Sequence, residues 1–169
     1  MRVAIVGVGD GWEDAPVNGT EVWGINHLIC RRPVSKVFDI HVLDACYTEE
    51  ERQHLVDARE KASEDNTPII EIGNYPLKEI IHEFGTDYFA CSAAYAIALA
   101  IYKGYDDIDL YGINQAAGTE YIFEKGCVEF WLGIAIGKGI KVTVHGEKSA
   151  VLMTRDKMLY GFNVPQKGR

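Results

Sequence analysis

The sequence predicts an α/β protein in which helices cover a mostly parallel sheet of about six strands. Short apolar runs alternate along the 169 residues with longer segments of helical spacing, which is the pattern of βαβ units. The runs are apolar throughout, as is typical of parallel strands that are buried on both faces. Residues 91–105 are apolar on nearly every side and predict a helix that is buried against that sheet.

The first half of the chain predicts three strands and one helix. Three runs are too short for helices and rich in β-branched residues, and they predict strands: residues 2–6, 21–25 and 36–41. Thr48 and Glu51 have the spacing of a capping box. A helix is therefore expected to begin here and to run to about residue 62.

The second half predicts three helices and three strands. Apolar residues at helical spacing predict the helices: residues 74–84, 92–103 and 121–137. Short apolar runs predict the strands: residues 68–72, 108–113 and 140–145. The third helix carries an aromatic stripe that includes Tyr121, Phe123 and Trp131, and this stripe is expected to face the core or a second subunit. Residues 146–169 form a C-terminal extension of one domain that spans residues 1–169.

Charge and composition exclude several classes of protein. The net charge of −8 argues against a protein that coats nucleic-acid phosphates, because such proteins need a surplus of lysine and arginine on one face. The four cysteines have neither CxxC nor zinc-site spacing, so free thiols in a reducing cytoplasm and no metal site are expected. No signal peptide and no run of about 18 apolar residues is present, so no membrane segment is expected. A small phosphorylated ligand is compatible with this composition.

A glycine-rich loop follows the first strand, with glycines at positions 7, 9 and 11 and Asp10 between the last two. Such a loop lets backbone N–H groups approach a ligand closely. Trp12 stands where a dinucleotide-binding motif has its third glycine, so standard NAD binding is disfavoured. A contact to a nucleotide-type phosphate or ribose and a purely structural turn are equally supported by the sequence.

Polar residues at three other element ends are candidate ligand-binding groups. Asn26 follows the second strand, where dinucleotide-binding folds place a ribose-binding acid, and its amide can both donate and accept. Ser92 is expected to cap the buried helix, and Asn114 follows the strand over 108–113. These ends lie on one edge of a parallel sheet. A turn at Asn26 and simple capping by Ser92 explain these residues equally well without a ligand.

The candidate catalytic residues are His41, His145 and Glu129. Both histidines end predicted strands, and Asp39 lies on the same face as His41 and can orient it. Glu129 falls on an otherwise apolar helix and is either a buried functional acid or half of a surface ion pair. Cys91 is a weaker candidate nucleophile, because the sequence pairs no base with it.

Five motifs resemble a compact Rossmann-like protein family that is associated with phage and prophage genomes. They are the glycine loop, W-G-I-N at 23–26, F-D-I-H at 38–41, the helix start at 91–93 and L-Y-G-I-N at 110–114. The resemblance implies a single-domain, three-layer Rossmann-like fold and a location in the cytoplasm of a phage-infected bacterial host. The layout is also similar, more distantly, to small bacterial sialyltransferases and to archaeal pterin pyrophosphokinase-like proteins.

The resemblance to the sialyltransferases implies a nucleotide site. Their matching positions contact the nucleotide of a CMP-sugar, which implies these ligand contacts here: Gly7, Gly9, Asp10, Asn26, Ser92 and Asn114. The segment that carries their lid and catalytic histidine is much shorter in this chain, and no residue matches that histidine by motif. The leading hypothesis is a nucleotide or nucleotide-sugar binding protein that acts as a glycosyl or nucleotidyl transferase, with no further cofactor. The alternatives are a non-catalytic binder of a nucleotide-derived signal and an interaction protein with a vestigial pocket. The aromatic helix is also compatible with a homo-oligomer.

Overall fold

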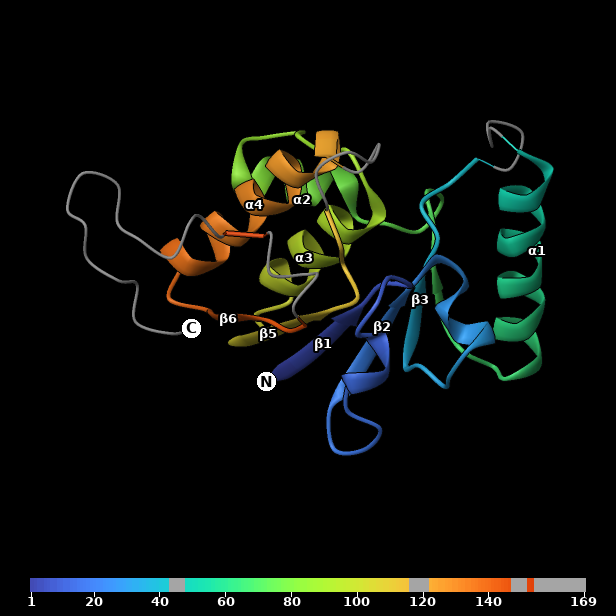
Figure 1. The fold of residues 1–169 in the computed structure, drawn as a ribbon. Helices are drawn as coiled ribbons and strands as arrows, with labels where there is room; N and C mark the ends of the chain where they lie inside the picture. Colours follow the sequence, from blue (N-terminus) through green and yellow to red (C-terminus); the bar gives the residue numbers. More distant parts are fainter. Residues whose placement is uncertain (43–47, 116–121, 147–151, 154–169) are drawn as a thin grey trace.

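The computed structural model describes residues 1–42, 48–115, 122–146 and 152–153. The described residues form a six-stranded sheet, four α-helices and two short 3-10 helices, which Figure 1 shows in one view. The strands are β1 (Arg2–Val6), β2 (Glu21–Ile25), β3 (Lys36–Phe38), β4 (Ile69–Ile70), β5 (Asp107–Tyr111) and β6 (Lys141–Val144). The helices are η1 (Trp12–Asp14), η2 (Asn26–Cys30), α1 (Glu49–Glu64), α2 (Leu77–Phe84), α3 (Ser92–Tyr102) and α4 (Ile122–Gly137).

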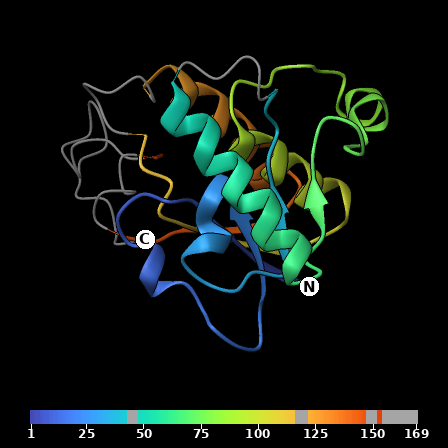
Figure 2. The same ribbon diagram turned by 90° about the vertical axis from the view of Figure 1, so that its right-hand side faces the viewer.

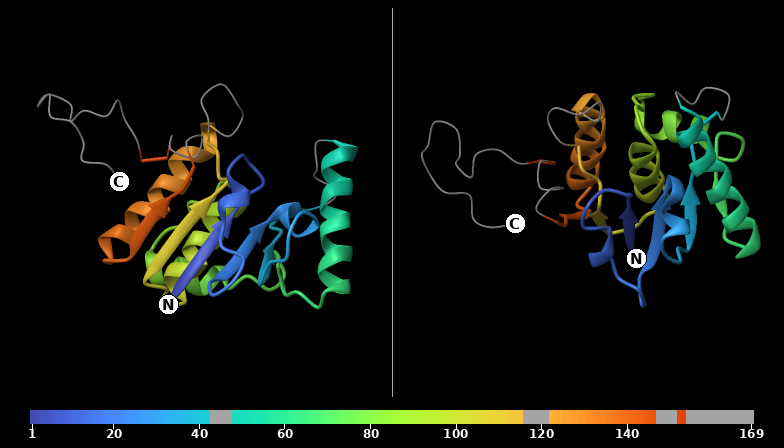
Figure 3. Two further views of the ribbon diagram at one scale, coloured as in Figure 1. Left: turned by 60° about the horizontal axis from the view of Figure 1, so that its bottom comes forward. Right: turned by 45° about the vertical axis from the view of Figure 1, so that its right-hand side comes forward.

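All neighbouring strands of this sheet pair in parallel, in the order β4-β3-β2-β1-β5-β6 (Figure 3). The predicted Rossmann-like α/β fold with a parallel sheet is thus confirmed. From β1 the chain moves outward to β4 and then returns to β5 on the other side of β1. Because every strand runs the same way, all the carboxyl ends meet at one edge, and ligands of such sheets bind at that edge near the point of reversal.

One face of the sheet is covered by α2, α3 and α4, which lie side by side above the strands in Figure 1. The buried helix α3 is rich in alanine, and Ala94, Ala96, Ala98 and Ala100 are fully buried. Small side chains on several sides let α3 pack between the sheet and both flanking helices. The prediction of a helix buried on nearly every face is confirmed.

The other face is covered over β2 and β3 by η2 and α1. Ile29 of η2 and Val37 of β3 pack with Ala58 and Ala62 of α1. Figure 2 shows α1 crossing in front of these strands. Thr48 caps α1 with the predicted capping box. Its hydroxyl accepts from the N–H of Glu51 at 3.1 Å, and the carboxylate of Glu51 accepts from the N–H of Thr48 at 3.1 Å.

Several predicted boundaries differ from the structure, and the predicted aromatic stripe of α4 faces the core only in part. β3 ends at Phe38 instead of residue 41, because its neighbour β4 has only two paired residues. In α4, Trp131 is buried as predicted, but Phe123 is 84% exposed and does not face the core. Tyr121 lies outside the described residues. None of the described helices is long and apolar enough to span a membrane.

The predicted C-terminal extension is described only in part. Leu152 lies in the core with 1% of its surface exposed, and the N–H of Met153 donates to Oε1 of Glu129 at 2.5 Å. This part of the extension therefore packs back on α4. The rest of the extension after residue 146 lies outside the described residues.

Candidate functional site

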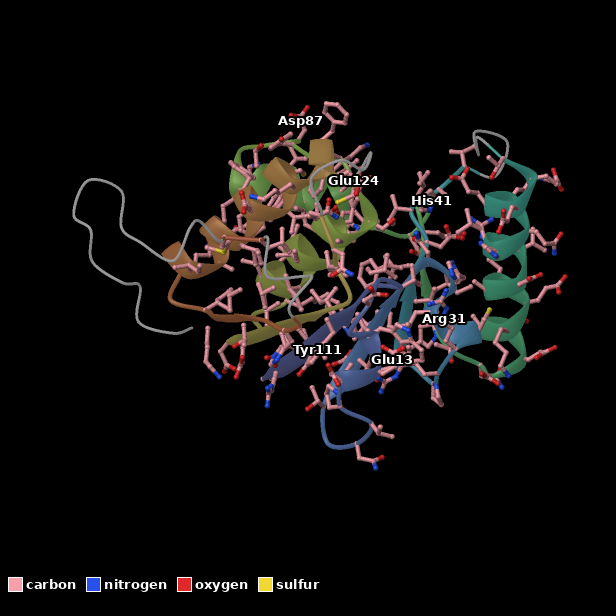
Figure 4. All side chains as sticks on the ribbon, viewed as in Figure 1. Glu13, Arg31, His41, Asp87, Tyr111 and Glu124 are labelled. Carbon is pink, nitrogen blue, oxygen red and sulfur yellow. The ribbon has the colours of Figure 1, made fainter. Side chains whose placement is uncertain are left out.

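The candidate site lies at the carboxyl edge of the sheet. Gly7, Asn26, Asp39, Gly112 and His145 directly follow β1, β2, β3, β5 and β6, so the parallel pairing brings them to one edge. α3 joins the start of β5 through a short turn, and its N-terminus at Ser92 must therefore lie at the opposite, carboxyl edge. In the view of Figure 4, His41 and Glu124 both lie above the sheet, at this edge.

The glycine loop is bonded to the loop that follows β5. The N–H of Gly7 donates to the carbonyl of Tyr111 at 2.8 Å, and that of Gly9 donates to the carbonyl of Gly112 at 2.9 Å. A Cβ atom on Gly7 would lie 2.5 Å from the carbonyl oxygen of Gly112, and one on Gly9 would lie 2.8 Å from it. Glycine is thus required here by the close approach of two loops. The amides of Gly7 and Gly9 are in use, so the structural alternative explains these two glycines.

The side chain of Asn114 completes the contact between the two loops. Its Nδ2 donates to the carbonyl oxygen of Asp10 at 3.3 Å. The bond uses the backbone of Asp10, and the Asp10 side chain is exposed. Asn114 and Asp10 therefore lie together at the edge, as the sequence predicts, with Asn114 bracing the loop.

Asn26 combines two unfavourable features at the end of β2. Its φ of 54° lies in the left-handed region, which costs an asparagine less than other residues but still carries strain. Its Oδ1 is buried and, among the described residues, accepts no hydrogen bond. An unsatisfied buried acceptor costs about 1–3 kcal/mol. Both costs fall on one residue, and this residue lies at the edge where open α/β sheets bind their ligands.

A buried aspartate orients His41. Asp39 has no exposed surface, and its Oδ1 accepts from Nδ1 of His41 at 3.0 Å. Arg59 of α1 donates its Nε to the other carboxylate oxygen at 2.5 Å and its Nη2 to the backbone oxygen of His41 at 3.3 Å. Because an ionised carboxylate can only accept hydrogen bonds, Nδ1 of His41 carries the proton that it donates to Asp39, and Nε2 lies on the opposite side of the ring. The predicted orientation of His41 by Asp39 is present.

A second buried aspartate holds His145. Asp109 of β5 is 1% exposed, and it accepts from Nε2 of His145 at 2.7 Å and from Nε of Arg2 at 2.5 Å. Burial by itself would raise the pKa of the Asp109 carboxyl, but the hydrogen bonds from Arg2 and His145 outweigh it and lower that pKa. The ring of His145 also stacks on Tyr111, with centroids 4.1 Å apart and planes 3° apart. His145 is therefore part of a brace between β5 and β6.

The start of α3 differs from the prediction. The N-cap is Cys91, and Ser92 is a buried residue of the first turn, so Ser92 does not cap the helix. Burial raises the pKa of the Cys91 thiol to about 12. A thiol of this kind stays protonated near neutral pH, which makes Cys91 a poor nucleophile.

Glu129 forms an ion pair, which is the second of the two roles that the sequence leaves open. It is half-buried on α4, where its Oε1 pairs with Nζ of Lys125 four residues earlier at 2.5 Å. The same oxygen accepts from the N–H of Met153. Glu129 therefore joins α4 to the segment that follows β6.

Three residues at or near the edge are missed by the sequence analysis: Arg31, Arg59 and Gln115. Gln115 is 5% exposed, its Nε2 lies 3.5 Å from Oε2 of Glu124, and its Oε1 has no partner among the described residues. Arg59 is one position after the buried Ala58 and four after the buried Leu55, so an arginine beside the apolar stripe of a helix was the available signal. Arg31 carries no signal in the sequence beyond its charge.

No metal centre is found within the part of the chain that the structure describes, since no cluster of three His, Cys, Asp or Glu side chains could hold an ion. Cys30, Cys91 and Cys127 are free thiols, and Cys46 lies outside the described residues. Comparison of the chain with protein-family models, with curated proteins and with solved structures gives no match.

Proposed function

We propose that the carboxyl edge of the sheet binds a nucleotide or nucleotide sugar, and that His41 serves as the base of a transfer reaction. The observation that carries this proposal is Asn26, with its left-handed backbone and its buried oxygen that lacks a donor. Strained backbone and unmet hydrogen bonds persist where a function requires them. A ligand that donates to Asn26 would remove the second of these costs.

The chemistry of Asn26 suits a nucleoside. Its Oδ1 accepts from the exocyclic amine of a base or from a ribose hydroxyl. A neutral amide also avoids the repulsion that a carboxylate at this position would exert on a nearby phosphate. The resemblance of the motifs to those of the sialyltransferases makes cytidine nucleotides the first ligands to test.

The register of β2 and β3 brings Asn26 and the Asp39–His41 pair to the same edge of the sheet. Ile25 pairs with Phe38, so Asn26 and Asp39 are the next residues on neighbouring strands, and His41 follows two residues later. Asp39 fixes the tautomer of His41, and Arg59 balances the charge of Asp39. The ring of His41 is thereby held in one orientation at the edge, as the geometry of a general base requires.

The proposed step is the transfer of a sugar to a hydroxyl acceptor. The acceptor oxygen forms a bond to the anomeric carbon, and the bond from that carbon to the phosphate oxygen breaks. The nucleotide leaves with the electron pair, and the acceptor proton passes to Nε2 of His41. A base in this role contributes about 10²- to 10⁴-fold to the rate.

A thermal-shift screen tests the nucleotide site. A nucleotide at one hundred times its Kd should stabilise the protein by about 2.7 kcal/mol and raise its Tm by about 5–10 °C. The Asn26→Gly variant should lose this shift. Glycine accepts the left-handed backbone, so this variant removes the amide without adding strain.

The outcomes separate the hypotheses. If neither cytidine, uridine nor adenosine nucleotides change the Tm, or if Asn26→Gly keeps the full shift, the nucleotide site is wrong. Incubation with CMP- and UDP-sugars then tests transfer. Stabilisation without turnover supports the alternative, a non-catalytic binder of a nucleotide-derived signal.

A further inference from the structure

Arg31 is an exposed arginine that pairs with no carboxylate of the described residues. Its Nη1 donates to the carbonyl oxygen of Val8 at 3.0 Å, and its Nη2 lies 3.3 Å from Nε2 of His27. Within the described ranges no carboxylate oxygen lies within 4.0 Å of Arg31, whereas Arg2, Arg52 and Arg59 all form ion pairs. A guanidinium has five N–H donors, so most of those of Arg31 are available. The chain as a whole has a net charge of −8, so acidic side chains outnumber basic ones.

Two histidines adjoin Arg31. The ring of His27 in η2 stacks on that of His54 in α1, with centroids 4.5 Å apart and planes 30° apart. Burial lowers the pKa of His27, and the neighbouring His54 and Arg31 lower it further. Arg31, His27 and His54 thus form a cluster of basic groups, here called the basic cluster. An anion beside this cluster would be attracted by the charge of the Arg31 guanidinium.

The basic cluster is built on the helix that Asn26 begins. Asn26 is the first residue of η2, His27 is the second, and Arg31 directly follows the last. Arg31 is bonded to the carbonyl of Val8, two residues after the end of β1, so its guanidinium connects η2 to the glycine loop. Figure 4 shows Arg31 in the region between the sheet and α1.

The neighbouring Arg32 shows the contrasting, structural use of an arginine. Its Nη1 donates to the carbonyl of Ala15 at 3.0 Å and its Nη2 to that of Pro16 at 2.7 Å. These bonds fix the loop after η1. Arg32 therefore donates to backbone carbonyls with both of its terminal nitrogens. Arg31 is exposed and keeps N–H donors that form no hydrogen bond with the described residues.

We propose that the basic cluster binds the phosphate or diphosphate group of the ligand. A planar guanidinium with free N–H groups matches two phosphate oxygens at once, and the imidazoles add further donors when protonated. The amides of Gly7 and Gly9, which a phosphate loop would use, are bonded to the carbonyls of Tyr111 and Gly112. The phosphate contact is therefore assigned to Arg31 and not to the glycine loop. The identity of the phosphate as part of a nucleotide rests on the proposed function, but the anion site itself does not.

Pyrophosphate is the probe that tests the anion site. In a ¹H–¹⁵N NMR titration of the full chain, pyrophosphate should shift the imidazole signals of His27 and His54 in a saturable way. The variant Arg31→Gln should weaken this binding at least tenfold. The matched control is Arg52→Gln, which removes an exposed arginine of α1 that pairs with Glu49 at 3.4 Å, and it should change the affinity less than twofold. Absence of saturable binding, or equal losses in both variants, overturns the inference.

A comparison of CMP with cytidine separates this inference from the proposed function. Arg31→Gln should lower the affinity for CMP at least tenfold and leave that for cytidine unchanged. If the variant weakens CMP and cytidine equally, the anion site is wrong and the nucleotide site stands. If no nucleoside or nucleotide binds but Arg31→Gln still abolishes pyrophosphate binding, the anion site stands and the proposed function fails.

Discussion

The clusters around Asp39 and Asp109 are built from the same three groups and differ in what they leave available. In each, a buried aspartate accepts from the Nε of an arginine at 2.5 Å and from a histidine. His41 uses Nδ1 and bonds an aspartate two residues earlier in its own chain segment. His145 uses Nε2 and bonds an aspartate in the neighbouring strand, with its ring stacked on Tyr111.

The choice of ring nitrogen decides the role of each histidine. When Nδ1 is bound, Nε2 at the far end of the ring is directed away from the backbone. When Nε2 is bound, the remaining Nδ1 lies close to the backbone of its own residue, where a substrate has little access. The same three residue types therefore give a candidate base at β3 and a structural brace at β5 and β6.

The largest expected difference between the clusters is in transfer activity. With the CMP- or UDP-sugar that wild type turns over, His41→Gln should lower kcat/KM by about 10²- to 10⁴-fold, because it removes the general base. His145→Gln should change kcat/KM less than about threefold, since His145 acts only as a brace. Equal losses in the two variants would contradict the assignment of roles.

The next effect is on the stability of the Asp39 cluster. Asp39→Ala should lower the free energy of unfolding by about 2–3 kcal/mol, because it leaves the half-buried Arg59 without its carboxylate. Urea unfolding followed by circular dichroism measures this loss. Arg59→Met combined with Asp39→Ala should recover part of the loss, and a double variant no more stable than Asp39→Ala would refute a buried ion pair as the cause.

A smaller loss of stability is expected at the Asp109 cluster. Asp109→Ala should cost about 1–2 kcal/mol in the free energy of unfolding, less than Asp39→Ala. The reason is that Arg2 is 49% exposed and His145 is 32% exposed, so both return to water when the carboxylate is removed. The same urea series ranks the two variants, and the reverse order would show that exposure of the partners does not set the cost.

The smallest effect is a dependence of stability on pH. The pKa of the Asp109 carboxyl is lowered in the folded state, because the bonds from Arg2 and His145 outweigh burial. Its contribution is therefore complete above its unfolded pKa of about 3.9 and is lost as the pH falls below that value. Wild type should lose more stability between about pH 4 and pH 3 than Asp109→Asn does. Equal losses of stability in the two proteins would show that Asp109 does not contribute to the loss of stability in acid.

The sequence predicted where some of the candidate residues lie in the fold. The sequence places Asn26, Asp39 and His41 at strand ends, and the structure brings them to one edge. The hydrogen bond between Asp39 and His41 was predictable because both belong to one short segment. Arg59 was not, since it reaches Asp39 from a helix 20 residues away. The same applies to Arg2 and Asp109, which are separated by 107 residues.

The structure distinguishes three alternatives that the sequence left open, for a shared reason. The amides of Gly7 and Gly9 are used by the loop after β5, the thiol of Cys91 is buried, and Phe123 does not face the core. Each outcome depends on which other segment packs against the residue. A local motif describes the residue's own backbone and side chain but not its neighbours in space.

The sequence by itself determined the parallel sheet, the buried helix α3, the cap of α1 and the edge at which a ligand would bind. These follow from short-range periodicity, capping and strand direction, all of which act over a few residues. Only the tertiary structure decided that His41 is bonded through Nδ1 and His145 through Nε2, that the glycine amides are occupied, and that Arg31 lacks an acidic partner among the described residues. Those outcomes depend on hydrogen bonds and charges between distant segments, which form only when the sheet and its helices pack together.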